Sequence, residues 1–224
     1  MISTRIVAIS VLGAALSAPF VCAGDLSRYR EFQFAMDLPA VIKQAKLEPP
    51  EPKLIHQRPA VIQELAWHPE RLLGSSLETD PVNEVIFSFY NGELFRIVVN
   101  YDRYKIEGLT TEDMIEALSA DYGPATKPAA EIALDRNERQ KVLARWEDPQ
   151  YSVNLVRSYY GLTFTMVVFS KRLDPLARAA ITEAIQIERQ EAPQREIERQ
   201  KKQDEEMRVV HEKARLVNKP SFRP

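Results

Sequence analysis

Side chains that favour molecular recognition gather at two places in the chain. Segment 100–105 follows a run of β-forming residues, and segment 157–160 precedes the glycine at position 161. Tyrosine and arginine are frequent anchors at protein interfaces, and loops at strand ends often carry binding groups. The candidate binding residues are Tyr101, Asp102, Arg103, Tyr104, Arg157, Tyr159 and Tyr160. The alternative is that Tyr101 packs in the core and that Asp102 and Arg103 form an exposed ion pair.

Acid–base or metal chemistry has weaker support. His56 and His68 flank an expected strand, so a shared metal ion would require the chain to fold back, and His211 lies in a charged tail. Adjacent carboxylates such as Glu147 and Asp148 could act as acid and base. However, 32 acidic residues supply such pairs by chance. We therefore predict no metal site and no catalytic residue, and an enzyme is the less favoured interpretation.

Glycine and cysteine usage excludes several kinds of site. The chain has seven glycines, and no two of them lie within ten residues of each other. Phosphate-binding loops, dinucleotide fingerprints and nucleophile elbows all need closely spaced glycines. One cysteine cannot build a cysteine-based zinc site. We therefore predict no cofactor.

The first 23 residues are typical of a bacterial signal peptide. Arg5 precedes an apolar run from Ile6 to Leu16, which is too short to span a bilayer. Val21-Cys22-Ala23 places small side chains at the −3 and −1 positions of a cleavage site. We predict an exported, periplasmic or secreted protein that is cleaved after Ala23. An uncleaved anchor and a lipidated Cys22 are the alternatives.

Length predicts one globular domain of ordinary size, or two small ones, with a tail, and a single domain is favoured. Residues 24–190 are expected to form the domain, and 191–224 form a charged helical or disordered tail. The formal net charge is −2, and basic and acidic residues are mixed, so nucleic acid is not an expected partner. No later segment is long and apolar enough to cross a membrane. An envelope protein is the expected partner, and the tail is one candidate for binding it.

Helices are expected at three places. Asp37 is a typical N-cap for a first helix, and Thr110 opens a second with capping-box spacing to Asp113. A third helix should begin at Asp174-Pro175 and be interrupted at Pro193. Its expected buried face is Leu176, Ala180, Ile181, Ala184 and Ile185.

Strands are expected between these helices. Asn91-Gly92 separates the runs 85–90 and 94–99 and predicts a β-hairpin, with Phe89 opposite Leu94 and Ile86 opposite Ile97. Further strands are expected at 61–67, 142–146, 151–157 and 162–170, and a polar loop at 125–140. The predicted fold class is α+β, a mainly antiparallel sheet packed by two or three helices. The tryptophan spacing leaves open a tandem repeat of helix and hairpin.

One helix segment resembles a known family. Gly108-Leu109-Thr110-Thr111-Glu112-Asp113-Met114, continuing to Tyr122-Gly123-Pro124, resembles the helix motif of small envelope proteins of the outer-membrane assembly lipoprotein type. A tandem form of that unit resembles the β-lactamase-inhibitor-protein fold. Phe34–Leu38 resembles a second, weaker copy of the helix motif. The resemblance implies helices packed on an antiparallel sheet and a role in protein binding. The family's glycine-methionine pair and lipobox cysteine are not matched.

The favoured function is therefore non-catalytic. We expect a binding or scaffold protein of the cell envelope, which contacts another envelope protein through its sheet or its tail. A hydrolase with a carboxylate or histidine base is one alternative. A module that binds a small ligand or peptidoglycan is the other.

Overall fold

The structure is a computed structural model that describes residues 24–69, 80–128, 131–135, 138–157, 163–221 and 223. The predicted signal peptide and the candidate residues Tyr159 and Tyr160 lie outside these ranges. The helices are α1 (Leu38–Ala45), α2 (Thr111–Tyr122), α3 (Leu173–Asn218) and the short 3-10 helix η3 (Lys219–Ser221). The strands are β1 (Arg28–Tyr29), β2 (Phe32–Gln33), β3 (Lys53–His56), β4 (Ile62–Trp67), β5 (Val82–Tyr90), β6 (Glu93–Tyr101), β7 (Glu131–Asp135), β8 (Glu138–Glu147), β9 (Tyr151–Arg157) and β10 (Phe164–Ser170).

The predicted α+β class is confirmed. Eight strands form one antiparallel sheet in the order β3-β4-β5-β6-β10-β9-β8-β7, and β1 and β2 form a separate small hairpin. Each half of the chain contributes one helix followed by four consecutive strands. The last strands of the two halves, β6 and β10, pair with each other at the centre of the sheet. Trp67 and Trp146 both lie on the second strand of their half. The order of elements is therefore repeated in tandem, and the repeated unit is a helix with four strands, which is larger than the helix and hairpin expected from the sequence.

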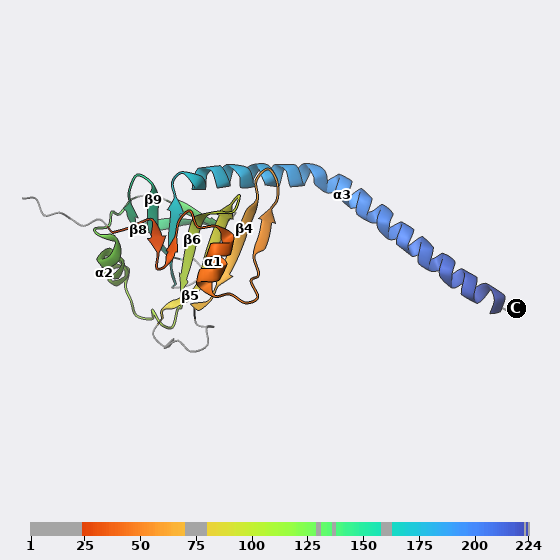
Figure 1. The fold of residues 1–224 in the computed structure, drawn as a ribbon, viewed down its shortest axis with the longest axis horizontal. Coiled ribbons are helices and arrows are strands. Elements are labelled where there is room, and N and C mark those ends of the chain that lie inside the picture. Colours follow the sequence, from red (N-terminus) through yellow and green to blue (C-terminus); the bar gives the residue numbers. More distant parts are fainter. Residues whose placement is uncertain are drawn as a thin grey trace, which may run out of the picture.

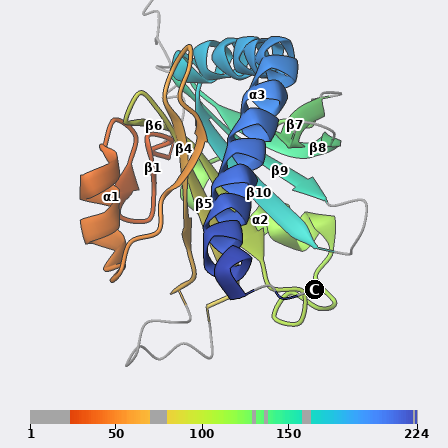
Figure 2. The same ribbon diagram turned by 90° about the vertical axis from the view of Figure 1, so that its right-hand side faces the viewer.

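The two faces of the sheet carry different helices. Successive side chains of a strand point to opposite faces, and on β6 Ile97 joins the main core while Val98 packs with a second cluster. The main core holds α1, α2 and the β1–β2 hairpin, which lies between these two helices (Figure 1, Figure 2). Aromatic side chains of the hairpin fill the gap, with Phe32 4.5 Å from Phe87 between ring centres. The beginning of α3 covers part of the other face, where Leu173 and Ala177 pack on Phe95.

Local helix signals behave as predicted at two sites. The Asp37 side chain accepts a hydrogen bond from Ala40 N, and the Thr110–Asp113 capping box is complete. These bonds satisfy backbone donors that have no partner inside the helix. Such caps depend only on neighbouring residues, which is why the sequence revealed them.

The hairpin register differs from the predicted one. Phe89 faces Leu94 as expected, but Ile86 faces Val98, because an irregularity between Ser88 and Phe89 shifts the pairing by one residue. A bulge of this kind adds one residue to one strand. The predicted loop at 125–140 is also wrong in part, since β7 and the beginning of β8 occupy the residues described there.

The predicted break of the third helix at Pro193 is wrong. α3 begins at Leu173 and continues through Pro193 to Asn218, a helix of 46 residues. Proline removes a hydrogen bond to the carbonyl four residues earlier, here that of Arg189, which lies in the exposed part of the helix where water can replace the bond. Leu176, expected in the buried face, is 49% exposed, whereas Ala177 and Asp174 are buried.

The second half of α3 projects away from the domain (Figure 1). His56 Nδ1 lies 2.8 Å from Glu188 Oε1, and Arg58 Nη2 lies 2.9 Å from Glu191 Oε2. From position 192 every described residue to the end of the helix is exposed. We call Ala192–Asn218 the arm. At 1.5 Å per residue it is about 40 Å long.

Candidate functional site

A cavity of about 500 Å³ opens where the β1–β2 hairpin, α2 and the ends of β5 and β6 meet. Its volume lies within the range of about 300–1,000 Å³ that is usual for small-molecule sites. Three tyrosines line it, and we call it the tyrosine pocket. Its lining consists of Asp25, Arg28, Tyr29, Arg30, Pro81, Val82, Tyr101, Leu118, Asp121, Tyr122 and Met166.

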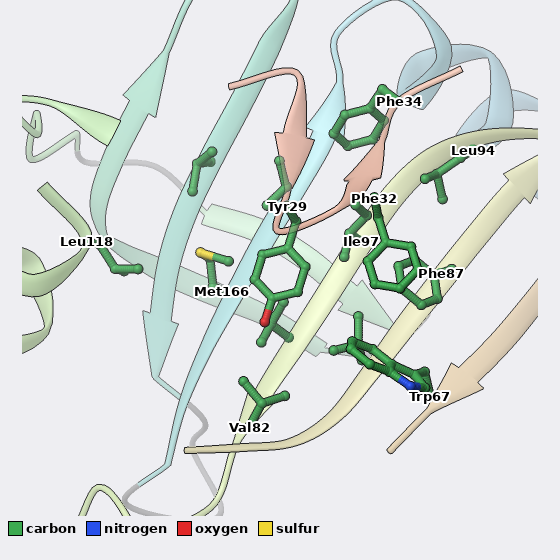
Figure 3. Packing of buried hydrophobic residues seen from close by; sticks show 14 of the residues in the cluster. Tyr29, Phe32, Phe34, Trp67, Val82, Phe87, Leu94, Ile97, Leu118 and Met166 are labelled. Carbon is green, nitrogen blue, oxygen red and sulfur yellow. The ribbon is translucent and has the colours of Figure 1, made fainter. Parts of the chain in front are cut away.

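The three tyrosines reach the pocket from the ends of different elements. Tyr29 ends β1, Tyr101 ends β6 and Tyr122 ends α2. In Figure 3 the Tyr29 side chain extends toward Val82, with its hydroxyl at that end. Burial raises the pKa of all three hydroxyls, that of Tyr122 to about 12. Each tyrosine carries its proton at neutral pH, as an ordinary tyrosine does, and can both donate and accept a hydrogen bond.

Arg30 is held beside these hydroxyls by a two-point contact. Its Nη1 and Nη2 atoms donate to Asp80 Oδ2 and Oδ1 at 2.9 and 2.8 Å. Arg30 occupies the tight turn after Tyr29 with φ of 52°, and Asp80 also accepts a hydrogen bond from Val82 N. Burial raises the pKa of Asp80, but the hydrogen bonds from Arg30 and Val82 outweigh it and leave this pKa below its usual value. Parallel contacts of this kind fix the guanidinium plane.

The rim of the pocket has balanced charge. Arg28 Nε lies 3.2 Å from Asp25 Oδ2, and hydrogen bonds from the Ser27 side chain and backbone hold the pKa of Asp25 below its usual value. Asp121 adds a second carboxylate, and Arg30 a second guanidinium. The lining thus offers equal numbers of cations and anions. It suits a ligand that has many polar groups and little net charge.

The Arg30–Asp80 contact gives a test of how firmly the pocket is built. Asp80→Asn should lower the free energy of unfolding by about 1 kcal/mol at pH 7, since both groups are only partly buried. A carboxylate whose folded pKa lies below its unfolded value stabilises the protein above the unfolded pKa, about 3.9. The difference between wild type and variant should therefore shrink as the pH falls through the folded pKa. Urea denaturation between pH 2 and pH 7 measures it.

Asp204→Asn is the matched control for this measurement. Asp204 lies on the exposed arm, where Oδ1 accepts a hydrogen bond from Gln200 at 3.0 Å. Its replacement should change stability by less than about 0.5 kcal/mol at any pH. Equal effects of the two variants would mean that Asp80 does not hold Arg30 in solution.

The structure separates the predicted binding residues. Tyr101 lines the tyrosine pocket. Asp102 instead closes the next turn, because its Oδ1 accepts a hydrogen bond from Tyr104 N at 2.8 Å. Arg103 lies over the Tyr104 ring, with 4.9 Å from guanidinium carbon to ring centre, and Tyr104 is 72% exposed. Arg157 lies over Phe164 at the end of β9, so it does not join Tyr101.

Most of the pocket could not be read from the sequence. Tyr29, Arg30 and Asp25 come from a segment for which no element was predicted, and Tyr122 was interpreted only as part of a helix end. The only indication of a binding site in this segment was the adjacent pair Tyr29-Arg30, which matches no known sequence motif. These residues meet only because the hairpin folds back between α1 and α2.

The histidines take structural positions. His68 Nδ1 lies 3.1 Å from Asn83 O, and because a carbonyl can only accept, this nitrogen carries the proton. His68 Nε2 is 3.7 Å from Glu84 Oε1, and Glu84 Oε2 accepts a hydrogen bond from Asn100 Nδ2 at 3.3 Å. These contacts connect the end of β4 with β5 and β6, on the face of the sheet opposite the main core. His56 contacts Glu188 and so helps to hold α3 against the domain.

The carboxylates considered for acid–base work are also engaged elsewhere. Glu147 Oε2 lies 2.7 Å from Lys171 Nζ, and this hydrogen bond lowers the pKa of Glu147. Within the part of the chain that the structure describes, no three His, Cys, Asp or Glu side chains are grouped so that they could hold a metal ion. None of the described helices has the length and apolar character needed to cross a membrane.

Comparison with known proteins gives no relative from which a function could be transferred. No protein-family model, no curated protein and no solved structure matches the chain. The functional interpretation therefore depends on the tyrosine pocket and the arm.

Proposed function

We propose that this is an exported, non-catalytic binding protein of the cell envelope and that the tyrosine pocket is its ligand site. The single observation that carries the proposal is the convergence of three protonated tyrosines on a fixed guanidinium in a cavity of about 500 Å³. Export is proposed from the signal-peptide pattern, with cleavage after Ala23.

The lining favours a neutral, hydroxyl-rich ligand such as a sugar. Carboxylates of Asp25 and Asp121 can accept hydrogen bonds, while the guanidiniums and tyrosine hydroxyls can donate them. The apolar side chains of Val82, Leu118 and Met166 close the pocket but are at most 9% exposed, so polar groups would make most of the contacts to a sugar. A strongly charged ligand would disturb this balance of charge, because one of the paired groups would lose its partner.

The test is a titration of the purified chain 24–224 with chitobiose and maltose, followed by nuclear magnetic resonance. Backbone signals of Tyr29, Tyr101 and Tyr122 should shift on addition of a sugar. Tyr101→Phe removes one hydroxyl and should weaken binding by about 2- to 10-fold, equivalent to one hydrogen bond. Tyr90→Phe makes the same change against α3, on the other face of the sheet, and should leave binding unchanged.

Other outcomes would redirect the proposal. Shifts with citrate or spermidine but not with sugars would contradict the neutral-ligand class. Release of monosaccharide during the titration would favour the hydrolase alternative. For that reaction the low pKa of Asp25 suits a base and not an acid. Equal weakening of sugar binding by Tyr90→Phe and Tyr101→Phe would mean that the tyrosine pocket is not the binding site.

A scaffold role of the arm is the second candidate. Its last turns expose Met207, Val210, Ala214 and Val217, which follow one another at the i, i+3, i+7 spacing of a helix contact seam. Four basic residues and one acidic residue lie between positions 207 and 219. Charge complementarity therefore favours an acidic amphipathic helix of another envelope protein as the occupant.

Truncation after Gln190 tests this second candidate. Crosslinking in the native periplasm should yield a partner with the full mature chain and lose it with the truncated chain, and the partner should contain an acidic helix. Retention of the same partner by the truncated chain would mean that the arm is not the element that binds this partner. Crosslinks only between copies of this chain would show self-association in place of a scaffold role.

A further inference from the structure

Gly24 packs tightly against the C-terminal end of α2. A Cβ atom at this position would lie 2.0 Å from the carbonyl oxygen of Asp121 and 2.6 Å from the Cα of Tyr122. Both contacts involve backbone atoms, which cannot turn away as a flexible side chain would. The position therefore requires glycine on steric grounds. It is also the residue that cleavage after Ala23 would place first.

The end of α2 that Gly24 touches is electronegative. The C-terminus of a helix carries about half a negative charge, because its last carbonyl groups point outward without partners inside the helix. α2 has no basic residue in its last turn, and Asp121 adds a carboxylate there. A cation at this place would be stabilised by the helix dipole.

The nitrogen of Gly24 is close enough to supply that cation. Because the N–Cα and Cα–Cβ bonds are each about 1.5 Å long, this nitrogen lies within about 5 Å of the Asp121 carbonyl oxygen. In the precursor it belongs to an uncharged amide. A signal peptidase adds water to the Ala23–Gly24 bond, leaving a carboxylate on Ala23 and an ammonium group on Gly24 at neutral pH.

We propose that the α-ammonium group of Gly24, which forms only on processing, caps the C-terminus of α2. The inference rests on the proposed export and cleavage. The charged and titratable groups around the amine are Asp121 and Tyr122 of α2, and Asp25 and Arg28 of the N-terminal segment. Asp25 follows Gly24 directly and lines the pocket. Processing thus fixes both α2 and the segment that leads into Tyr29.

Three forms of the mature chain test the cap. They are the chain beginning at Gly24, the same chain with its α-amine acetylated, and a chain that retains Ala23. The free Gly24 form should melt about 1–4 °C higher than the acetylated form at pH 6.5. A group whose pKa is raised on folding stabilises the protein below the unfolded pKa, and this stabilisation disappears as the pH rises through the folded pKa. The difference should therefore be gone by about pH 10.

Further measurements separate the cap from simple packing. Nuclear magnetic resonance of the Gly24 amine should give a pKa above the ordinary value of an α-amino group. Asp121→Asn should bring that pKa back toward the ordinary value. Gly24→Ala should lower the melting temperature at every pH, because its effect is steric. The Ala23-retaining chain should resemble the acetylated form, since its ammonium group lies one residue farther from α2.

An ordinary amine pKa, with equal melting temperatures of the free and acetylated forms at pH 6.5, would overturn the cap. Sequencing the N-terminus of the exported protein tests the processing step separately. A first residue other than Gly24 would also overturn the inference, even if the sugar titration succeeds. Failure of sugar binding alone would leave the cap standing.

Discussion

Asp174→Ala is expected to lower the free energy of unfolding by about 3–5 kcal/mol, the usual cost of breaking a buried ion pair by removing one partner. Asp174 is 5% exposed and lies in the first turn of α3. Its Oδ1 accepts hydrogen bonds from Nε (3.1 Å) and Nη2 of Arg96 on β6, and its Oδ2 accepts one from Arg178 Nε at 2.6 Å. Removal of the carboxylate leaves two guanidiniums close together at the point where α3 meets the sheet.

Urea denaturation at pH 7 measures this effect. Asp174→Asn keeps the shape and one acceptor oxygen and should cost less than the alanine variant. Asp204→Ala, on the exposed arm, is the control and should change stability by less than about 0.5 kcal/mol. A cost below about 1 kcal/mol for Asp174→Ala would mean that packing of Leu173 and Ala177 fixes α3 without help from the ion pairs.

Trp146→Ala is expected to have an effect of similar size, about 3–5 kcal/mol. Trp146 is 2% exposed and joins the main core on β8. Its Nε1 donates a hydrogen bond to the Gly123 carbonyl at 2.8 Å, and its ring centre lies 6.2 Å from that of Tyr122. The side chain thus fastens the end of α2, and with it one wall of the tyrosine pocket, to the sheet.

Two further variants keep this prediction testable if the alanine variant does not fold. Trp146→Phe retains most of the ring volume but removes the donor, so it should cost about 1–3 kcal/mol. Tyr104→Ala truncates an aromatic ring that is 72% exposed and should cost less than about 0.5 kcal/mol. Thermal unfolding ranks all three. If Trp146→Phe weakened sugar binding no more than Tyr104→Ala, the position of α2 would be unimportant for the pocket.

Local signals in the sequence were sufficient for much of the secondary structure. The caps at Asp37 and Thr110 and the Asn91-Gly92 turn involve residues at most three positions apart, so nothing distant was needed to find them. The same locality explains the errors. A bulge at Phe95 of β6, opposite Ser88 and Phe89, changes the register without changing the apolar pattern, and Pro193 stays helical because its surroundings are exposed.

The tertiary structure alone decided the sheet order and the candidate site. Pairing of β6 with β10 joins residues that are 65 to 73 positions apart in the chain, and no local pattern in the sequence indicates that these two strands are neighbours. Tyr29, Tyr101 and Tyr122 are likewise far apart in the chain and meet because a hairpin, a strand and a helix end at one place. The sequence by itself determined the α+β class, the caps and the charged tail. Convergence of distant side chains depends on which long-range contacts bury the most apolar surface, so it became visible only in the folded molecule.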